Sequence, residues 1–154
     1  VRNIFGETRE RLNVRYLELG RTLGEALMEP HLCYYNQLKP LLPLIKGLAH
    51  ITGSGLIGNV PRVLPAGLAA ELHSNTWTIP PIFNLIQKQG NVPKDEMYHV
   101  FNMGIGMVII CAPGNLKQLT QALPEAAVIG KIIDQPGDAR VVIDGTGYHK
   151  DKVL

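Results

Sequence analysis

The chain has 154 residues, of which 45% are apolar and 18% charged, enough for one domain with a buried core. This composition excludes disorder as the main state, and no apolar run approaches the roughly 20 residues that a membrane-spanning helix needs. Fifteen basic residues against thirteen acidic ones give a net charge of +2, and the basic residues are scattered. Neither a nucleic-acid-binding surface nor a membrane-binding surface is indicated.

The sequence favours several short helices. Residues 4–12 are typical of the last part of an amphipathic helix. Thr22 and Glu25 have the spacing of a capping box, in which each side chain satisfies a free backbone N–H, so a helix is predicted over 23–28. Further helices are predicted over 34–45, 56–64, 80–89, 93–100 and 115–123. Two prolines interrupt the first of these.

Five short apolar runs favour buried strands, because they are rich in apolar residues and bounded by turn residues. They are residues 47–52, 68–73, 103–111, 127–133 and 139–143. Since strands and helices alternate, the most economical architecture is an α+β fold with a mixed sheet covered by helices. Residues 1–144 are expected to form this domain, and the polar residues 145–154 a flexible tail.

A glycine-rich turn is the first candidate functional feature. The predicted strand 47–52 leads into Thr52, Gly53, Ser54 and Gly55, and a predicted helix follows. Free backbone N–H groups at a helix start can bind phosphate, and glycine lets the backbone approach a ligand closely. The alternative is a tight turn with a structural role only.

Two further segments carry residues that suit a phosphate ligand. Asn59 and Arg62 follow the glycine turn by one or two helical turns, and an arginine can bind phosphate with two hydrogen bonds. An ordinary surface arginine is the alternative. Asn102, Gly104 and Gly106 lie in or beside a predicted buried strand, where glycine indicates either close approach of a ligand or a bulge.

His50 stands in an apolar strand beside the glycine turn, so it is either a site residue or a satisfied core histidine. The other histidines lack a partner at a recognisable spacing and are assigned to the surface or the core: His31, His73, His99 and His149. No spacing of histidines, cysteines or carboxylates suggests a metal centre. From the residues alone, the chain is interpreted as a domain that binds a phosphate-bearing ligand.

Taken in order, these segments form a longer pattern. It comprises His-Ile-Thr-Gly-x-Gly-Leu from His50, Asn-Val-Pro-Arg from Asn59 and Phe-Asn-Met-Gly-Ile-Gly-Met from Phe101. The pattern resembles the aminoimidazole ribonucleotide synthetase family, also called phosphoribosylformylglycinamidine cyclo-ligase, over about residues 1–144. Two departures stand out. Ser54 replaces a glycine usual in the family, and 30–32 read Pro-His-Leu where the family tends to have Pro-Thr-Arg.

The resemblance implies that this chain is the C-terminal half of that enzyme. In the family this half is a three-layer α/β/α domain that is partly ferredoxin-like. The complete enzyme would use ATP to close the imidazole ring of formylglycinamidine ribonucleotide, giving aminoimidazole ribonucleotide, ADP and phosphate in purine biosynthesis. His50 would be catalytic, as a general acid or base or as a hydrogen-bond donor to the activated amide. The residues expected to bind substrate are Thr52, Gly53, Ser54, Gly55, Asn59, Arg62, Asn102, Gly104 and Gly106.

The resemblance also sets expectations for the whole protein. ATP and Mg²⁺ would be held mostly by an N-terminal half that precedes this segment, and the complete enzyme would be a cytoplasmic homodimer with no nucleic-acid or membrane partner. This chain alone would be inactive and would expose apolar surface where its partner half packs. Two other interpretations stay open: a free-standing phosphate-ligand-binding or regulatory domain without ATP chemistry, and another member of the same ATP-dependent superfamily.

Overall fold

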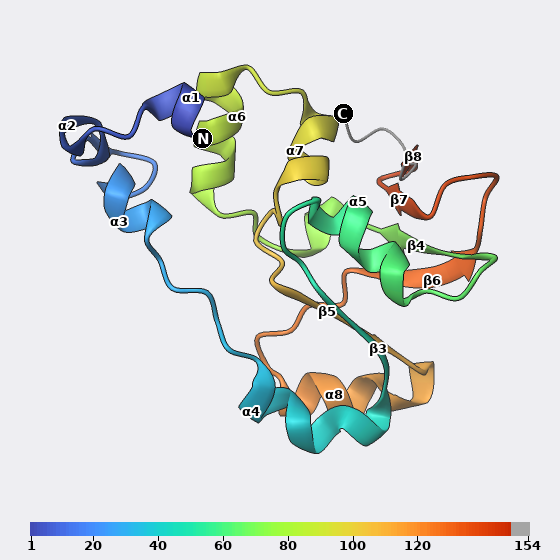
Figure 1. Cartoon of the computed structure of the whole chain (residues 1–154). Helices are drawn as coiled ribbons and strands as arrows, with labels where there is room; N and C mark the ends of the chain where they lie inside the picture. The colour runs from blue at the N-terminus through green and yellow to red at the C-terminus, as the bar shows by residue number, and fades with distance from the viewer. Residues whose placement is uncertain (149–154) are drawn as a thin grey trace.

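The structure, a computed structural model, describes residues 1–148 (Figure 1). The described residues form eight short strands in three sheets. The largest sheet has the order β6-β4-β7-β8, in which β4 and β7 are parallel and the other neighbours antiparallel. β3 pairs antiparallel with β5, and β1 with β2. The strands are β1 (Arg15–Tyr16), β2 (Arg21–Thr22), β3 (Ile45–His50), β4 (Leu68–Leu72), β5 (Met107–Cys111), β6 (Gly130–Asp134), β7 (Val141–Ile143) and β8 (Thr146–Tyr148).

Short helices surround these sheets, which confirms the predicted α+β class. Within residues 1–148 the α-helices are α1 (Arg2–Phe5), α2 (Arg9–Leu12), α3 (Leu23–Leu27), α4 (Tyr35–Leu38), α5 (Gly55–Asn59), α6 (Pro81–Gly90), α7 (Lys94–Val100) and α8 (Leu116–Ala122). The 3₁₀ helices are η1 (Lys39–Leu44), η2 (Val60–Val63), η3 (Ser74–Thr76) and η4 (Pro113–Asn115). α4, η1 and α8 gather at one end of the β3–β5 pair, and α7 lies near the other end (Figure 1). None of the described helices is long and apolar enough to cross a membrane.

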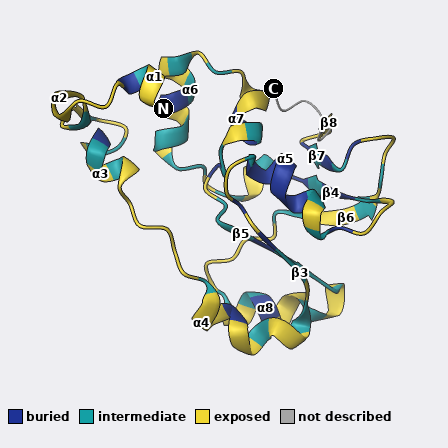
Figure 2. Cartoon of the chain, in the orientation of Figure 1, coloured by how far each residue is buried: buried dark blue, intermediate teal, exposed yellow. Residues whose placement is uncertain are grey.

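The core centres on α5 and its neighbours. Every residue of α5 is buried, and Figure 2 shows this helix as the most deeply buried one. An apolar sequence on all sides makes a helix an interior element. The largest fully buried side chains are Tyr98, Leu23, Ile51, Leu56, Ile57, Met97, Val60 and Val141. Because α7 packs against α5, this core fixes the turn that connects β3 to α5.

The capping box at the start of α3 is confirmed. Thr22 Oγ1 accepts from Glu25 N–H at 3.2 Å, and Glu25 Oε2 accepts from Thr22 N–H at 2.8 Å. Thr22 lowers the pKa of the Glu25 carboxyl below its ordinary value, mainly through its backbone N–H and secondly through its hydroxyl. A purely local pattern therefore fixed both the position and the start of this helix.

The structure differs in extent from several expectations drawn from the sequence. Residues 4–12 form two helices, because Gly6 (φ +73°) turns the chain between them. Over 34–45 only α4 is α-helical, and the proline-containing remainder is 3₁₀. The strand expected over 103–111 begins only at Met107, because Met103 and Gly104 have positive φ. Within the expected flexible tail 145–154, residues 146–148 form β8, which pairs with β7, and residues 149–154 lie outside the described ones.

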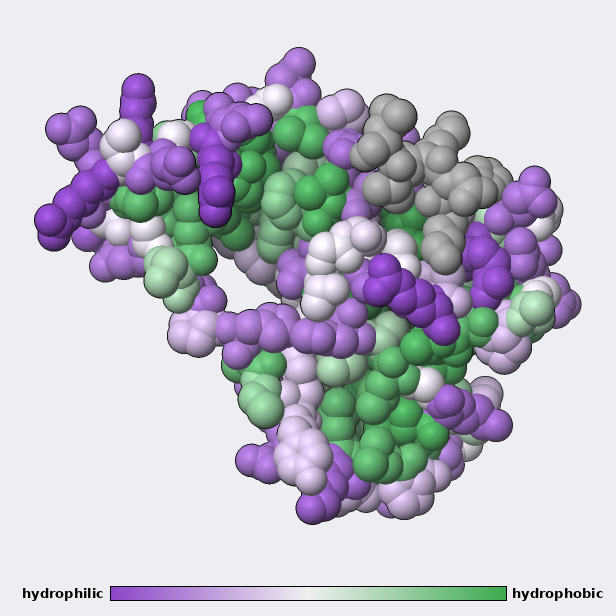
Figure 3. All heavy atoms as spheres, viewed as in Figure 1, coloured by the Kyte–Doolittle hydropathy of each residue, from purple (hydrophilic) through white to green (hydrophobic). Residues whose placement is uncertain are grey.

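Apolar side chains also gather on the surface of the lobe that α4, η1 and α8 form (Figure 3). Among them Tyr35, Leu42 and Leu116 are exposed. Above this lobe a single extended connector, residues 28–34, runs from α3 to α4 (Figure 1). We call this connector the strap. Figure 3 shows an open gap between the strap and the upper part of the molecule.

Candidate functional site

An open hollow of about 310 Å³ lies at the end of β3. Three segments line it: the strap, the end of β3 with the turn that follows, and the residues around the end of α7. Its lining residues are His31, His50, Ile51, Thr52, Gly53, Val100, Phe101 and Asn102. The fold therefore brings together four of the predicted site residues, His50, Thr52, Gly53 and Asn102, and adds His31 from the strap.

His50 is exposed at the end of β3, so the interpretation as a core histidine is wrong. Its Nε2 lies 2.8 Å from Nε2 of His31, and the two ring centroids are 5.0 Å apart. His31 also meets the ring of Tyr34 edge-on at 5.8 Å. His31 was not among the predicted site residues, and the one sequence signal that marks it is the departure from the family pattern at 30–32.

The glycine turn is built around two left-handed residues. Ser54 precedes α5 with φ +74°, and Gly55 has φ +53°. A Cβ on Gly55 would lie 2.6 Å from the carbonyl oxygen of Phe101 and closer still to that of Tyr98, so only glycine fits there. Gly53 has open space where its Cβ would be. Gly55 therefore seats the turn on the end of α7, while Gly53 faces the hollow.

Asn59 is buried at the end of α5, where its side chain points back toward the glycine turn. Its Nδ2 donates to the carbonyl oxygens of Gly53 at 2.9 Å and of Gly55 at 2.7 Å. Buried carbonyl groups need such partners, because leaving one unpaired is costly. The structure thus places Asn59 behind the turn, as a tie that holds its backbone, rather than in the lining of the hollow.

The segment after α7 makes a second tight turn beside the hollow. Asn102 Oδ1 accepts from Gly104 N–H at 3.2 Å, and Gly104, with φ +92°, packs against the ring of Pro80. Gly106 lies under the hydroxyl of Tyr34 and accepts a hydrogen bond from Ile51 N–H at 2.9 Å. Gly104 and Gly106 therefore allow close packing of neighbouring protein groups, and of the three predicted residues here only Asn102 lines the hollow.

Arg62 is exposed in η2 and is not among the residues that line the hollow. A different arginine, Arg140, holds the segment 61–65 that contains Arg62. Its Nη2 donates to the carbonyl of Leu64 at 2.8 Å and to those of Pro61 and Pro65 at 3.3 and 3.2 Å. This clasp joins two segments more than seventy residues apart. The sequence carries no local pattern that indicates it.

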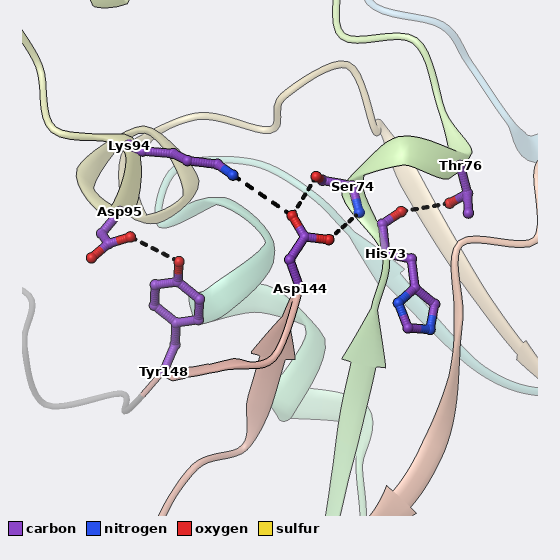
Figure 4. Close-up of polar contacts among 7 residues, drawn as sticks. All are labelled: His73, Ser74, Thr76, Lys94, Asp95, Asp144 and Tyr148. Atoms are coloured by element: carbon purple, nitrogen blue, oxygen red, sulfur yellow. Dashed lines mark hydrogen bonds and ion pairs between the residues drawn. The ribbon is translucent and has the colours of Figure 1, made fainter.

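A polar cluster ties the ends of β4 and β7 to α7 (Figure 4). Asp144 accepts from the backbone N–H of Ser74 at 2.8 Å and from its hydroxyl, and Lys94 Nζ lies 3.7 Å away. These hydrogen bonds, with the Lys94 charge, lower the pKa of the Asp144 carboxyl. Tyr148 donates to Asp95 Oδ1 at 2.9 Å, and burial, followed by this contact, raises the pKa of the Tyr148 hydroxyl. The cluster lies away from the lining of the hollow and anchors β8.

The fold and the hollow define an α+β domain whose candidate site is built from backbone, threonine, asparagine and two imidazoles. A family model described as AIR synthase related protein, C-terminal domain, matches residues 2–143. The chain belongs to this family, and the resemblance seen in its sequence is confirmed.

Curated relatives agree with this assignment. A protein of Enterococcus faecalis named phosphoribosylformylglycinamidine cyclo-ligase is 45% identical over 125 residues, which cover 80% of this chain and 36% of the relative. A protein of the same name from Alkaliphilus metalliredigens is 42% identical over 153 residues, covering 93% of this chain and 43% of the relative. The chain thus spans less than half the length of the curated relatives it matches.

Proposed function

We propose that this chain is the C-terminal domain of a phosphoribosylformylglycinamidine cyclo-ligase and that the hollow at the end of β3 is its share of the active site. One observation carries the proposal: relatives that are 42–45% identical to this chain over the aligned 125 to 153 residues bear that name. The hollow supports it, because four residues chosen for their place in the family pattern line one cavity.

In the proposed reaction, ATP phosphorylates the formyl amide oxygen of formylglycinamidine ribonucleotide. The amide oxygen is a poor leaving group, and phosphorylation turns it into a good one. The amidine nitrogen of the same molecule then attacks the activated carbon, the ring closes, and phosphate leaves with the oxygen. Holding the substrate folded for this attack supplies several kcal/mol through orientation alone.

The residues of the hollow suit the proton transfer in this sequence. Its lining residues include no carboxylate, lysine or arginine, so the two histidines are its titratable side chains. In our proposal His50 accepts the proton that the amidine nitrogen loses, or donates a hydrogen bond to the activated amide. Thr52, Gly53 and Asn102 contact the substrate. The proposed roles of Ser54 and Arg62 are contacts at the edge of the site, while Gly55, Asn59, Gly104 and Gly106 shape its walls.

ATP and Mg²⁺ belong to the proposal only through the rest of the complete protein. Within residues 1–148, no group of three or more histidines, cysteines or acidic residues is placed to hold a metal ion. The described residues therefore do not fit a Mg²⁺ site. We assign ATP and Mg²⁺ mostly to the N-terminal half, and we propose that the complete enzyme is a cytoplasmic homodimer. The exposed apolar lobe of α4, η1 and α8 supplies a surface for that half.

The test uses the complete protein of which this chain would be the C-terminal domain. We expect His50→Ala to lower turnover at least tenfold, because acid–base catalysis contributes about 10²–10⁴-fold in enzymes. The matched control is His73→Ala, since His73 is also an exposed histidine but does not line the hollow. Unchanged turnover in His50→Ala would contradict the catalytic role of His50.

A second measurement separates the proposed ligase from a free-standing binding domain. The 154-residue chain alone should show no ATP-dependent ring closure, whereas the complete protein should convert formylglycinamidine ribonucleotide with one ADP formed per product. A complete protein that binds the ribonucleotide but never consumes ATP would favour the binding or regulatory interpretation. The shared name of the relatives argues against other members of the superfamily.

A further inference from the structure

The two imidazoles of the hollow face each other through the same atom. Nε2 of His31 and Nε2 of His50 are 2.8 Å apart, the distance of a hydrogen bond. A neutral imidazole has one N–H donor and one lone-pair acceptor. Two N–H groups, or two lone pairs, would repel at this distance. One proton therefore lies between the two nitrogens, so one ring is the donor and the other the acceptor.

Nothing else in the lining of the hollow competes for this role. The lining residues of the hollow include no carboxylate that would orient either ring. His31 is itself held in place, because Tyr34 meets its ring edge-on and both pack beside Gly106. A Cβ on Gly106 would collide with the Tyr34 hydroxyl and lie 3.3 Å from Cε1 of His31. The strap thus presents His31 to His50 in a defined orientation.

We propose that His31 is a positioning residue that sets which ring nitrogen of His50 carries the proton. If His31 donates, His50 keeps its proton on Nδ1, and if His31 accepts, His50 carries it on Nε2. Bases in active sites are commonly oriented by a third group in this way. An imidazole partner differs from a carboxylate because it can both donate and accept. This inference rests on the proposed function, in which His50 handles a proton.

The direct test is nitrogen NMR of the chain with ¹⁵N-labelled histidine, at about pH 8.5, where imidazoles are ordinarily neutral. We expect the rings of His31 and His50 to show opposite tautomers. His31→Leu should change the ¹⁵N shifts of His50, His31→Gln should retain much of the original pattern through its amide, and His73→Ala should leave them unchanged. The same tautomer on both rings, or an unchanged His50 in His31→Leu, would overturn the inference.

Kinetics of the complete protein supply the second readout. We expect His31→Leu to lower kcat about two- to tenfold with little change in KM, the size of one hydrogen bond, and His31→Gln to restore most of it. A fall that His31→Gln fails to restore would contradict positioning through this hydrogen bond. The two proposals fail separately: an active His50→Ala variant refutes catalysis by His50, whereas the tautomer measurement decides the pairing whatever the activity.

Discussion

Ser54 occupies the space that a side chain on Gly58 would need. A Cβ on Gly58 would lie well inside van der Waals contact with Ser54 Cβ, and beyond its own helix only Ser54 atoms lie within 4 Å of it. Ser54 also has a left-handed backbone, with φ +74°. This conformation costs a residue with a Cβ about 1–2 kcal/mol. One side chain therefore creates both a backbone strain and a steric block one helical turn later.

We expect Ser54→Gly to raise the free energy of unfolding by about 0.5–1 kcal/mol. The substitution removes the strain of a left-handed backbone that carries a Cβ, which stabilises the fold. Part of this gain is offset, because glycine loses more conformational entropy than serine on folding. Urea unfolding followed by circular dichroism measures it. A lower stability in Ser54→Gly would show that the serine hydroxyl makes a stabilising contact that outweighs the strain.

Because Ser54 blocks a side chain at Gly58, the effect of Gly58→Ala on the free energy of unfolding should depend on whether Ser54 is present. Alone, Gly58→Ala should destabilise the chain by about 1–3 kcal/mol, because the methyl group meets Ser54. On a Ser54→Gly background the same change should be neutral or stabilise by up to about 1 kcal/mol, since alanine is the better helix former. A double-mutant cycle of unfolding free energies measures this coupling. Additive effects would contradict the steric explanation.

The glycines of the turn should differ sharply in what they tolerate. Gly55→Ala places a methyl group against two backbone carbonyls at a left-handed position, so we expect a loss of about 3 kcal/mol or more. Gly53→Ala meets open space and should change stability by no more than about 0.5 kcal/mol. Thermal unfolding of the two variants compares them, and similar losses would refute the asymmetry.

The local parts of this fold could be read from the sequence because their causes are local. The capping box of Thr22 and Glu25 joins residues three apart, and it fixed the start of α3. The α+β class and the central strands followed from apolar runs. The errors fell where backbone geometry overrides such runs, as at Met103 and Gly104, whose positive φ delays β5.

The site could be predicted in composition but not in arrangement. The family pattern identified residue types, yet it did not show that Asn59 points back at the turn while Asn102 lines the hollow. His31 pairs with His50 across nineteen residues, and the strap that brings it there has no periodic signal. Contacts of this kind depend on the folded path of the chain, which no local spacing encodes.

Arg140 should matter more for stability than Arg62, although only Arg62 belongs to the family pattern. Arg140→Met removes hydrogen bonds to the carbonyls of loop 61–65 and should lower the free energy of unfolding by about 2–3 kcal/mol. Arg62→Met changes an exposed side chain and should stay within about 0.5 kcal/mol. Equal effects in chemical unfolding would show that the clasp contributes nothing to stability.

Asp144 should make the free energy of unfolding depend on pH in the acidic range. Its carboxylate accepts two hydrogen bonds from Ser74, and its pKa is lowered in the folded chain (Figure 4). A carboxyl whose folded pKa lies below its unfolded value stabilises the fold above that unfolded value, about 3.9, and loses this contribution as pH falls further. Asparagine suits the comparison, because it tolerates the left-handed backbone of Asp144 (φ +51°).

We therefore expect Asp144→Asn to be less stable than the parent chain at pH 7, with a gap that narrows as pH falls through about 4. At low pH Asp144 becomes protonated in the parent chain and loses its negative charge. The parent then loses the stabilisation that Asp144→Asn lacks at every pH, and the two chains become more alike in stability. Unfolding curves of both chains between about pH 7 and pH 3 measure this gap. Asp138→Asn is the matched control, an exposed carboxyl in the turn before β7, and should follow the parent throughout. A gap that stayed constant down to pH 3 would show that the Asp144 charge does not stabilise the tie to Ser74 and Lys94.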